Sequence, residues 1–351
     1  MTLANPVPFL AGLPIAAIAI DQTECVVAMN DAATRLLGQG LKGRNYASVL
    51  RHPVLLESVE ATIHDRARRT SRFVVNEGAR TAAFSATSYA VSNSFVIVCF
   101  EDQTDIEQVF QMRRDFVANV SHELKTPLTA MMGFIETLQT TARDDAQARG
   151  RFLNVMASET QRMNRLVGDL LSLSRVEADE RMRPTTSLDA KDLIQAALDA
   201  IAPLAQDYEA RVSFDAPKDP IEIFADKDQL QQVFTNLVEN GIKYSGKGAQ
   251  VGIKLGAPEY DPRLGETAVT ITINDNGPGI DSIHLPRLTE RFYRIDNHRS
   301  RELGGTGLGL AIVKHILNRH RGRLKIDSSL GQGSQFSVIL PSAKKRPADQ
   351  F

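Results

Sequence analysis

The chain has 351 residues, with 41 lysines and arginines against 42 aspartates and glutamates, and a net charge of -1 at pH 7. This length exceeds one ordinary domain, and 42% hydrophobic and 24% charged residues are typical of globular proteins, which excludes a disordered or fibrous chain. The balanced charge gives no basic excess that would indicate direct nucleic-acid binding.

The cysteines and the apolar stretches bear on the location of the chain. Cys25 and Cys99 have no spacing suited to a metal site or a disulfide framework, which favours a reduced, cytoplasmic setting. The longest apolar stretch, residues 8–20, is interrupted by Gly12 and Pro14 and is shorter than the roughly 20 residues that span a bilayer. We expect no transmembrane segment in this chain, while association with a membrane complex through a partner protein stays open.

Residues 1–102 combine short β-type runs with a helical patch. The runs IAAIAI and FVIVCF are typical of strands, and DAATRLLG is typical of a helix. This pattern predicts an α+β domain, and no catalytic motif is evident within it.

Residues 103–180 have helical periodicity. Apolar residues recur every three or four positions, first at Val117, Val120, Leu124, Leu128, Met131, Ile135 and Leu138, then at Met156, Met163, Leu166, Leu170 and Leu173. The stretch TARDDAQARG interrupts the periodicity, so we predict an αα-hairpin. Such a hairpin exposes apolar surface, and pairing with a second copy would close a four-helix bundle, so we expect a homodimer.

Residues 187–343 follow the linker RMRPTTS and interleave helical and strand-like segments, including DQLQQVFTNLVENGIKYS, VTITIN and AIVKHIL. This order predicts an α/β sandwich with helices on one face of a sheet. Residues 344–351 are predicted to be a tail. The whole chain is therefore predicted to be a multidomain α+β protein.

The first motif that carries chemistry is SHELKTPL, which contains His122. His122 lies roughly 200° around the helix from Val120 and should point outward, where a neutral imidazole can attack an electrophile. Thr126 shares its face and could position water, whereas Glu123 could take the imidazole proton only by reaching around the helix. Pro127 removes a backbone hydrogen bond and is predicted to bend the helix. Taken alone, an exposed histidine is usually only a surface residue.

The second motif is NLVENGIKY. Asn236 and Asn240 share a helical face, and Lys243 and Tyr244 follow about one turn later. Amide oxygens suit Mg²⁺, for which Asn240 is the candidate ligand, and a lysine suits phosphate. Taken alone, the motif is also compatible with a plain amphipathic helix.

The third motif, DNGPG, follows a strand. A carboxylate such as that of Asp275 accepts N–H bonds, and the exocyclic amine of adenine is a donor. Gly277 and Gly279 permit positive φ and close approach of a ligand to the backbone. In isolation this motif indicates only a turn.

The fourth motif, GGTGLGL, precedes a helix, and such a helix N-terminus presents N–H groups to phosphate. Its spacing matches neither a P-loop nor a Rossmann fingerprint. The stretch before it is long enough for a lid and contains ERFYR, whose Arg291 and Arg294 could reach phosphates. The candidate phosphate-binding residues of the motif are Gly305, Thr306, Gly307, Leu308 and Gly309.

These four motifs, in this order, resemble the H, N, G1 and G2 boxes of orthodox bacterial histidine kinases of two-component systems, and ERFYR resembles the F box. The resemblance covers about residues 110–343. It implies His122 as phosphoacceptor, Asp275 on adenine, the glycines around the triphosphate, and the two asparagines toward Mg²⁺ and phosphates. Thr126 matches the position linked to phosphatase activity.

The N-terminal part resembles a PAS sensor domain through LPIAAIAIDQTECVVAMNDAATRLLG, and the layout is most similar to phosphate-regulon sensor kinases. The resemblance implies autophosphorylation of His122 by ATP and transfer of the phosphoryl group to an aspartate of a response regulator. Kinases of this kind commonly carry membrane segments ahead of the PAS domain, and none is evident here.

Two other functions are compatible with parts of this pattern. An ATPase like gyrase or the heat-shock chaperones carries a general-base glutamate four residues before its Mg²⁺-binding asparagine, where this chain has Asn236, which cannot accept a proton from water. A non-catalytic PAS scaffold would be marked by a broken motif, and each motif here is intact.

Overall fold

The computed structural model describes residues 6–77, 80–92, 94–180, 182–296 and 303–343. The chain divides into two compact units, Met1–Ala118 and Asn119–Phe351. The predicted tail, residues 344–351, and part of the predicted lid, residues 297–302, lie outside the described residues. Within the described ranges, each helix is too short or too polar to cross a membrane.

The first unit contains a five-stranded antiparallel sheet in the order β2-β1-β5-β4-β3. Its strands are β1 (Ala16–Asp21), β2 (Val26–Met29), β3 (Arg69–Glu77), β4 (Arg80–Ser92) and β5 (Phe95–Asp102). Its helices include α1 (Val7–Ala11), α2 (Asp31–Leu37), α3 (Tyr46–Val49) and α4 (Pro53–Asp65). The two strands predicted from IAAIAI and FVIVCF are confirmed as β1 and β5, which are neighbours in the sheet.

Side-chain alternation along β1 explains how both faces of this sheet are covered. Ile18 and Ile20 point to one face and pack into a core that includes Val59 of α4. Ala17 lies in a second cluster with Leu10 of α1 on the opposite side. The predicted α+β character of this part of the chain is confirmed.

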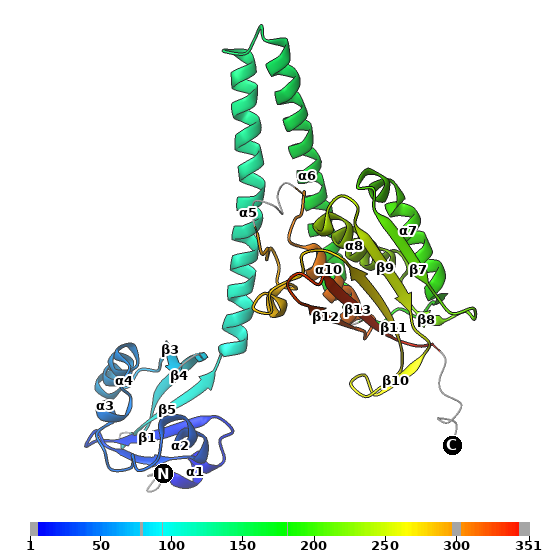
Figure 1. The fold of residues 1–351 in the computed structure, drawn as a ribbon. Helices are drawn as coiled ribbons and strands as arrows, with labels where there is room; N and C mark the ends of the chain where they lie inside the picture. The colour runs from blue at the N-terminus through cyan, green and yellow to red at the C-terminus, as the bar shows by residue number, and fades with distance from the viewer. Residues whose placement is uncertain (1–5, 78–79, 93, 181, 297–302, 344–351) are drawn as a thin grey trace, which may run out of the picture. The chain divides into compact units, whose positions relative to one another are not determined.

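The hairpin consists of α5 (Thr104–Gln139), whose residues from Asn119 onward belong to the second unit, and α6 (Ala146–Asp179). Figure 1 shows the two helices joined by a short turn, and Phe134 stacks on Phe152 at 5.2 Å between ring centroids. The turn is shorter than predicted because the Asp145 side chain caps α6, accepting hydrogen bonds from its first backbone N–H groups. The helix assignment of α5 is continuous through Pro127, which is buried.

The rest of the second unit is built on a sheet in the order β12-β13-β11-β9-β7 (Figure 1). The strands are β7 (Arg211–Asp215), β9 (Gln250–Leu255), β11 (Glu266–Asp275), β12 (Arg323–Ser328) and β13 (Ser334–Pro341). Only the β7–β9 pair among them is parallel. Four strands were not predicted from the sequence: β9 and the three short strands β6 (Ser187–Asp189), β8 (Glu222–Phe224) and β10 (Glu259–Asp261).

The helices α7 (Ala190–Asp207), α8 (Lys227–Ser245) and α10 (Gly309–Arg319) pack together on one face of this sheet, and a short 3₁₀ turn, η1, spans Leu285–Arg287. The buried residues of α8 repeat at helical spacing: Leu230, Val233, Phe234, Leu237, Val238, Gly241 and Ile242. The predicted α/β sandwich is confirmed.

The start of α8 is held by the end of α10. Asp226 caps α8 by accepting a hydrogen bond from the Gln229 N–H at 3.3 Å. The Asp226 N–H donates to Nε2 of His320 at 3.1 Å, and Arg319 pairs with the Asp226 carboxylate at 2.9 Å. These bonds fix where α8 begins and therefore which of its residues face away from the sheet.

His320 is 1% exposed, and its Nδ1 lies 2.7 Å from the Ile316 carbonyl oxygen. A ring that accepts at Nε2 and donates at Nδ1 is neutral. Burial lowers the pKa of His320, although the bond to Ile316 opposes this shift. Since the pKa is lowered in the folded state, the stabilisation by neutral His320 is present above the ordinary pKa of about 6.5 and is lost as the pH falls below it.

We expect His320→Gln to reduce the pH dependence of stability. Wild type should lose unfolding free energy as the pH falls from 7.5 to 5.5, and the variant should lose less over this interval. At pH 8 the variant should be less stable by about 1 kcal/mol, because glutamine cannot reproduce both hydrogen bonds. Urea unfolding at several pH values tests this, with the exposed His64→Gln as control; equal pH slopes for wild type and both variants would contradict the role of His320.

Candidate functional site

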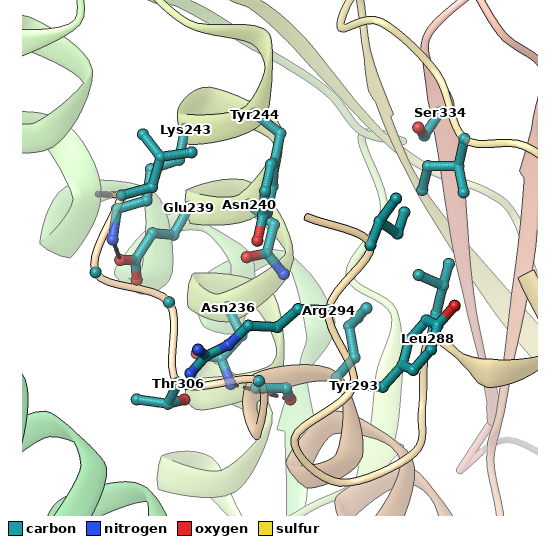
Figure 2. A pocket seen from close by; sticks show the side chains of 18 of the residues that line it. Asn236, Glu239, Asn240, Lys243, Tyr244, Leu288, Tyr293, Arg294, Thr306 and Ser334 are labelled. Atoms are coloured by element: carbon teal, nitrogen blue, oxygen red, sulfur yellow. Dashed lines mark hydrogen bonds and ion pairs between the residues drawn. The ribbon is translucent and has the colours of Figure 1, made fainter. Parts of the chain in front are cut away.

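A cavity of about 590 Å³ lies on the outer side of α8. Its walls come from α6, α8, the end of β11, the segment before the glycine-rich turn and that turn itself. The sequence-predicted residues that line it are Asn236, Asn240, Lys243, Tyr244, Asp275, Gly279, Arg294, Gly305, Thr306, Gly307 and Gly309 (Figure 2). Ile280, Leu288 and Phe336 add apolar surface. A volume of this size suits a nucleotide-sized ligand.

Three predicted nucleotide-binding residues lie outside this lining. Leu308 is 0% exposed and belongs to the core. Gly277 uses its N–H to donate to Asp275. Arg291 pairs with Glu177 of α6 at 2.5 Å. Their proposed contacts with the nucleotide stay predictions.

Asp275 is the last residue of β11, where the strand meets the cavity. Its Oδ1 accepts hydrogen bonds from the N–H groups of Gly277 at 2.9 Å and Ser334 at 3.2 Å. Burial raises the pKa of the Asp275 carboxyl, and these two bonds offset part of the rise. Since both bonds use Oδ1, they orient the side chain without engaging Oδ2.

The turn after Asp275 is packed against the loop between β12 and β13. Gly279 has a φ of +71°, and a Cβ there would overlap the carbonyl of Ser329. The Gly331 N–H donates to the Pro278 carbonyl at 2.7 Å, which holds the two loops together. Glycine is therefore required at 279 for both conformation and space.

The polar face of α8 supplies the amide and carboxylate groups of the cavity. The side-chain amide of Asn236 donates to the Gly309 carbonyl at 3.5 Å, and Asn240 lies one turn later (Figure 2). Lys243 forms an ion pair with Glu239, which also lines the cavity. Glu239 was missed in the sequence reasoning, although it lies four residues before Lys243, the spacing of a helical ion pair.

The glycine-rich turn leads directly into α10. Gly307 has a φ of +74° and accepts a hydrogen bond from the Phe292 N–H at 2.8 Å. The N-cap position of α10 is occupied by Leu308, so no side-chain cap covers the amides of its first turn. Such a helix start is suited to an anionic phosphate.

Helix α6 also contributes to the cavity, through Arg165, Gly168 and Asp169. Asp169 accepts a hydrogen bond of 2.6 Å from the hydroxyl of Thr306 in the glycine-rich turn. Burial raises the pKa of Asp169, and the bond from Thr306 opposes the rise. Sequence reasoning missed these α6 residues because they belong to no motif.

His122 and Thr126 lie on the exposed surface of α5 and not in the cavity lining. The Thr126 hydroxyl donates to the His122 carbonyl at 3.1 Å. Glu123 is turned away from solvent, and its carboxylate contacts Arg162 at 2.5 Å and Arg294 at 3.2 Å. Since Arg294 lines the cavity, the phosphoacceptor motif and the cavity are connected through this residue.

Comparison with known protein families identifies the class of protein to which the chain belongs. Residues 225–344 match the family described as histidine kinase-, DNA gyrase B- and HSP90-like ATPase. Residues 112–179 match the His Kinase A (phospho-acceptor) domain. An ATP-binding domain of this kind joined to a phospho-acceptor hairpin defines an ATP-dependent protein histidine kinase.

Relatives over nearly the whole length identify the family. The phosphate regulon sensor protein PhoR of Pseudomonas aeruginosa is 36% identical over 343 residues, which are 97% of this chain and 75% of PhoR. The sensor protein kinase WalK of Staphylococcus aureus is 35% identical over 333 residues, 92% of this chain and 77% of WalK. The chain therefore belongs to the sensor histidine kinases, which act by autophosphorylation and phosphotransfer in two-component systems.

A solved structure has a similar fold. The histidine kinase ThkA, in complex with response regulator protein TrrA, matches with a TM-score of 0.53 and 20% identity, covering 97% of this chain and 99% of that chain. This likeness concerns the fold alone.

The packing of Gly279 predicts that alanine there changes stability and ADP affinity more than alanine at a second glycine with the same φ. Gly265 also has a φ of +71°, but no described atom lies within 4 Å of the position of its Cβ. Gly265→Ala should cost about 1–2 kcal/mol of backbone strain and leave ADP affinity unchanged. Gly279→Ala should cost more and weaken ADP binding at least about tenfold, because the turn beside Asp275 must move. Urea unfolding measures the loss of stability, and calorimetric titration measures the ADP affinity. Equal stability and equal ADP affinity of the two variants would show that the overlap with the Ser329 carbonyl is relieved without moving the turn.

Proposed function

We propose that His122 accepts the γ-phosphoryl group of ATP and passes it to an aspartate of a response regulator. One observation carries this assignment: His122 is the only histidine within residues 112–179, the range that matches the phospho-acceptor family, and its side chain is exposed. The TrrA complex of ThkA supports a regulator as the partner.

The cavity suggests how the nucleotide lies. Asp275 is suited to accept a hydrogen bond from the adenine amine, beside the apolar surface of Ile280 and Phe336. The triphosphate would then extend toward the start of α10 and Arg294. On this basis we propose the remaining predicted residues, from Lys243 to the glycines, as nucleotide contacts.

Mg²⁺ fits the polar face of α8. Asn240 and Asn236 offer amide oxygens and Glu239 offers a carboxylate, and oxygen donors of this kind suit Mg²⁺ when phosphates complete its shell. When bound, Mg²⁺ would neutralise charge that develops on the transferred phosphoryl group. We propose Asn240 as the principal protein ligand.

The transfer step needs a nucleophile and a proton acceptor. A ring nitrogen of His122 forms a bond to the γ-phosphorus while the bond from phosphorus to the bridging oxygen of ADP breaks. The proton on the imidazole passes to the carboxylate of Glu123, the adjacent residue. Thr126, one turn after His122, is proposed to position water for hydrolysis of the phosphorylated regulator, which is the phosphatase reaction.

Two copies of the chain are proposed to pair through the hairpin. Large apolar side chains remain exposed on α5 and α6: Leu128 at 50%, Met132 at 64%, Ile135 at 43%, Leu153 at 52% and Leu171 at 57%. Leu128, Met132 and Ile135 follow helical spacing and form one stripe. Pairing in a four-helix bundle would bury this surface.

The remaining assignments concern location and domain limits. We propose a PAS-like sensor domain at residues 1–102, supported by its strand order 2-1-5-4-3, followed by the hairpin at 103–180 and the ATP-binding domain at 187–343. Because ATP is the phosphoryl donor, these domains are proposed to be cytoplasmic. Similarity to PhoR supports phosphate regulation as the signalling context.

The two alternatives are not favoured. A gyrase- or chaperone-like ATPase does not account for the match of residues 112–179 to a phospho-acceptor family. A non-catalytic scaffold does not account for a cavity lined by the nucleotide-binding motifs.

Incubation with γ-labelled ATP and Mg²⁺ should label wild type with an acid-labile phosphoramidate. His122→Ala should reduce labelling to background while nucleotide affinity stays within about twofold, because His122 lies outside the cavity lining. A chelator should abolish labelling of wild type. His64→Ala, at another exposed histidine, is the control; acid-stable labelling that survives His122→Ala would refute the assignment.

Light scattering at micromolar concentration should give twice the chain mass of 38.6 kDa. Met132→Glu should shift the mass toward the monomer, because it would bury a charge in each copy at the proposed interface. Leu330→Glu, at a residue 66% exposed in the β12–β13 turn, should leave the dimer intact. A monomeric wild type would rule out this dimer.

A further inference from the structure

Glu123 has its carboxylate occupied by two arginines. Oε2 accepts from Arg162 of α6 at 2.5 Å and from Arg294 at 3.2 Å, while Oε1 accepts from Arg294 at 3.4 Å. The Glu123 side chain is only 16% exposed. Guanidinium donors use three of the roughly four lone-pair directions of this carboxylate and hold it in place, so it is poorly positioned to take the proton of His122.

Arg294 contacts Glu123 and also lines the nucleotide cavity. Its side chain is 4% exposed, and both of its terminal nitrogens point to Glu123. The same residue lines the nucleotide cavity, where Figure 2 shows its guanidinium extending toward Asn236 and Thr306. Its Nε is buried and has no hydrogen-bond partner among the described residues. The guanidinium therefore already lies at the wall of the cavity, with one donor still to be satisfied.

A triphosphate in the cavity would compete with Glu123 for this guanidinium. A triphosphate carries more negative charge than the carboxylate even after Mg²⁺ neutralises part of it, and phosphate oxygens match the two-pronged donor geometry of arginine. Attraction between charges is stronger in a poorly hydrated site than in water. Nucleotide binding therefore favours movement of Arg294 from Glu123 to the phosphates.

Arg162 has a different position. It extends from α6, is 11% exposed, and is paired with Glu159 of the same helix at 3.5 Å. Arg162 does not line the cavity. It would therefore keep one oxygen of Glu123 in place when Arg294 leaves, so that the carboxylate is oriented while the other oxygen is released.

We propose that Arg294 couples occupancy of the nucleotide cavity to release of the carboxylate beside the phosphoacceptor histidine. Without nucleotide, Arg294 holds Glu123 and the proton acceptor is blocked. With nucleotide, Arg294 binds phosphate, and Glu123 retains Arg162 and is able to receive the His122 proton. Arg294 and Arg162 are thus positioning residues for Glu123. The consequence for proton transfer rests on the proposed function, whereas the competition for Arg294 does not.

A double-mutant cycle on nucleotide affinity tests the competition in the full-length chain. Titration with AMPPNP and Mg²⁺ measures the Kd of wild type, Glu123→Gln, Arg294→Gln and the double variant. Because the Gln side chain no longer holds Arg294 by charge, Glu123→Gln should tighten the Kd about fivefold. In the Arg294→Gln background the same change should leave the Kd within about twofold, since no guanidinium is left to release.

Controls separate this coupling from general effects of charge or folding. Glu136→Gln removes an exposed carboxylate from the same helix and should leave the Kd unchanged. Arg294→Lys retains the charge but loses the two-pronged geometry, so Glu123→Gln in that background should tighten the Kd by less than in wild type. Thermal melts establish that each variant is folded. An unchanged or weakened Kd for folded Glu123→Gln, or equal tightening with and without Arg294, overturns the proposal.

The outcome is distinguishable from failure of the proposed function. Labelling of His122 by ATP is measured on the same preparations. If the effect of Glu123→Gln on the Kd depends on Arg294 but His122 is not labelled, the phosphoacceptor assignment is overturned and the competition for Arg294 stands. If His122 is labelled but the effect of Glu123→Gln on the Kd does not depend on Arg294, the kinase assignment stands and the competition for Arg294 is overturned.

Discussion

The placement of α8 is the constraint on which the nucleotide site depends. Its apolar face is buried against the sheet and the neighbouring helices, so its polar face must look into the cavity. Its start is fixed by Asp226, which is held in turn by Arg319 and His320 at the end of α10. Rotation of α8 by one residue would expose apolar side chains and turn Asn236 and Asn240 out of the cavity.

Helix α6 connects the phosphoacceptor helix with the nucleotide cavity. One stretch of this helix bonds Glu123 through Arg162 and the glycine-rich turn through Asp169, and further on Glu177 pairs with Arg291. These contacts are charged or polar rather than apolar. Contacts of this kind can exchange partners when a more highly charged ligand enters, whereas tightly packed apolar cores resist rearrangement.

Two partly buried carboxyl groups of the cavity show what such polar contacts cost in folding free energy. Burial raises the pKa of both Asp275 and Asp169, so each is costly to keep charged in the folded protein. Asp275 is oriented by backbone N–H groups toward a ligand, and Asp169 instead holds Thr306. Carboxyl groups that are kept in such surroundings despite this cost are typical of binding or catalytic sites rather than of residues that only stabilise the fold.

Several parts of this protein follow from the sequence alone because their cause is local. The periodicity of apolar residues determines the two hairpin helices, α8 and β11. Of the two glycines predicted to permit positive φ, Gly277 and Gly279, the second has it. The outward position of His122 follows from the same periodicity. The residues of four motifs were therefore predictable, and most of the predicted nucleotide residues do line one cavity.

Tertiary structure alone decided which charges meet. Glu123 and Arg294 are separated by 171 positions, and a pairing at that distance leaves no periodic or local signal in the sequence. The same holds for Asp169 with Thr306, and for the short strands β6 and β8, which form only because distant segments meet. Local patterns determined which residues are exposed or buried, whereas the fold determined that the carboxylate beside His122 is held by an arginine of the nucleotide cavity.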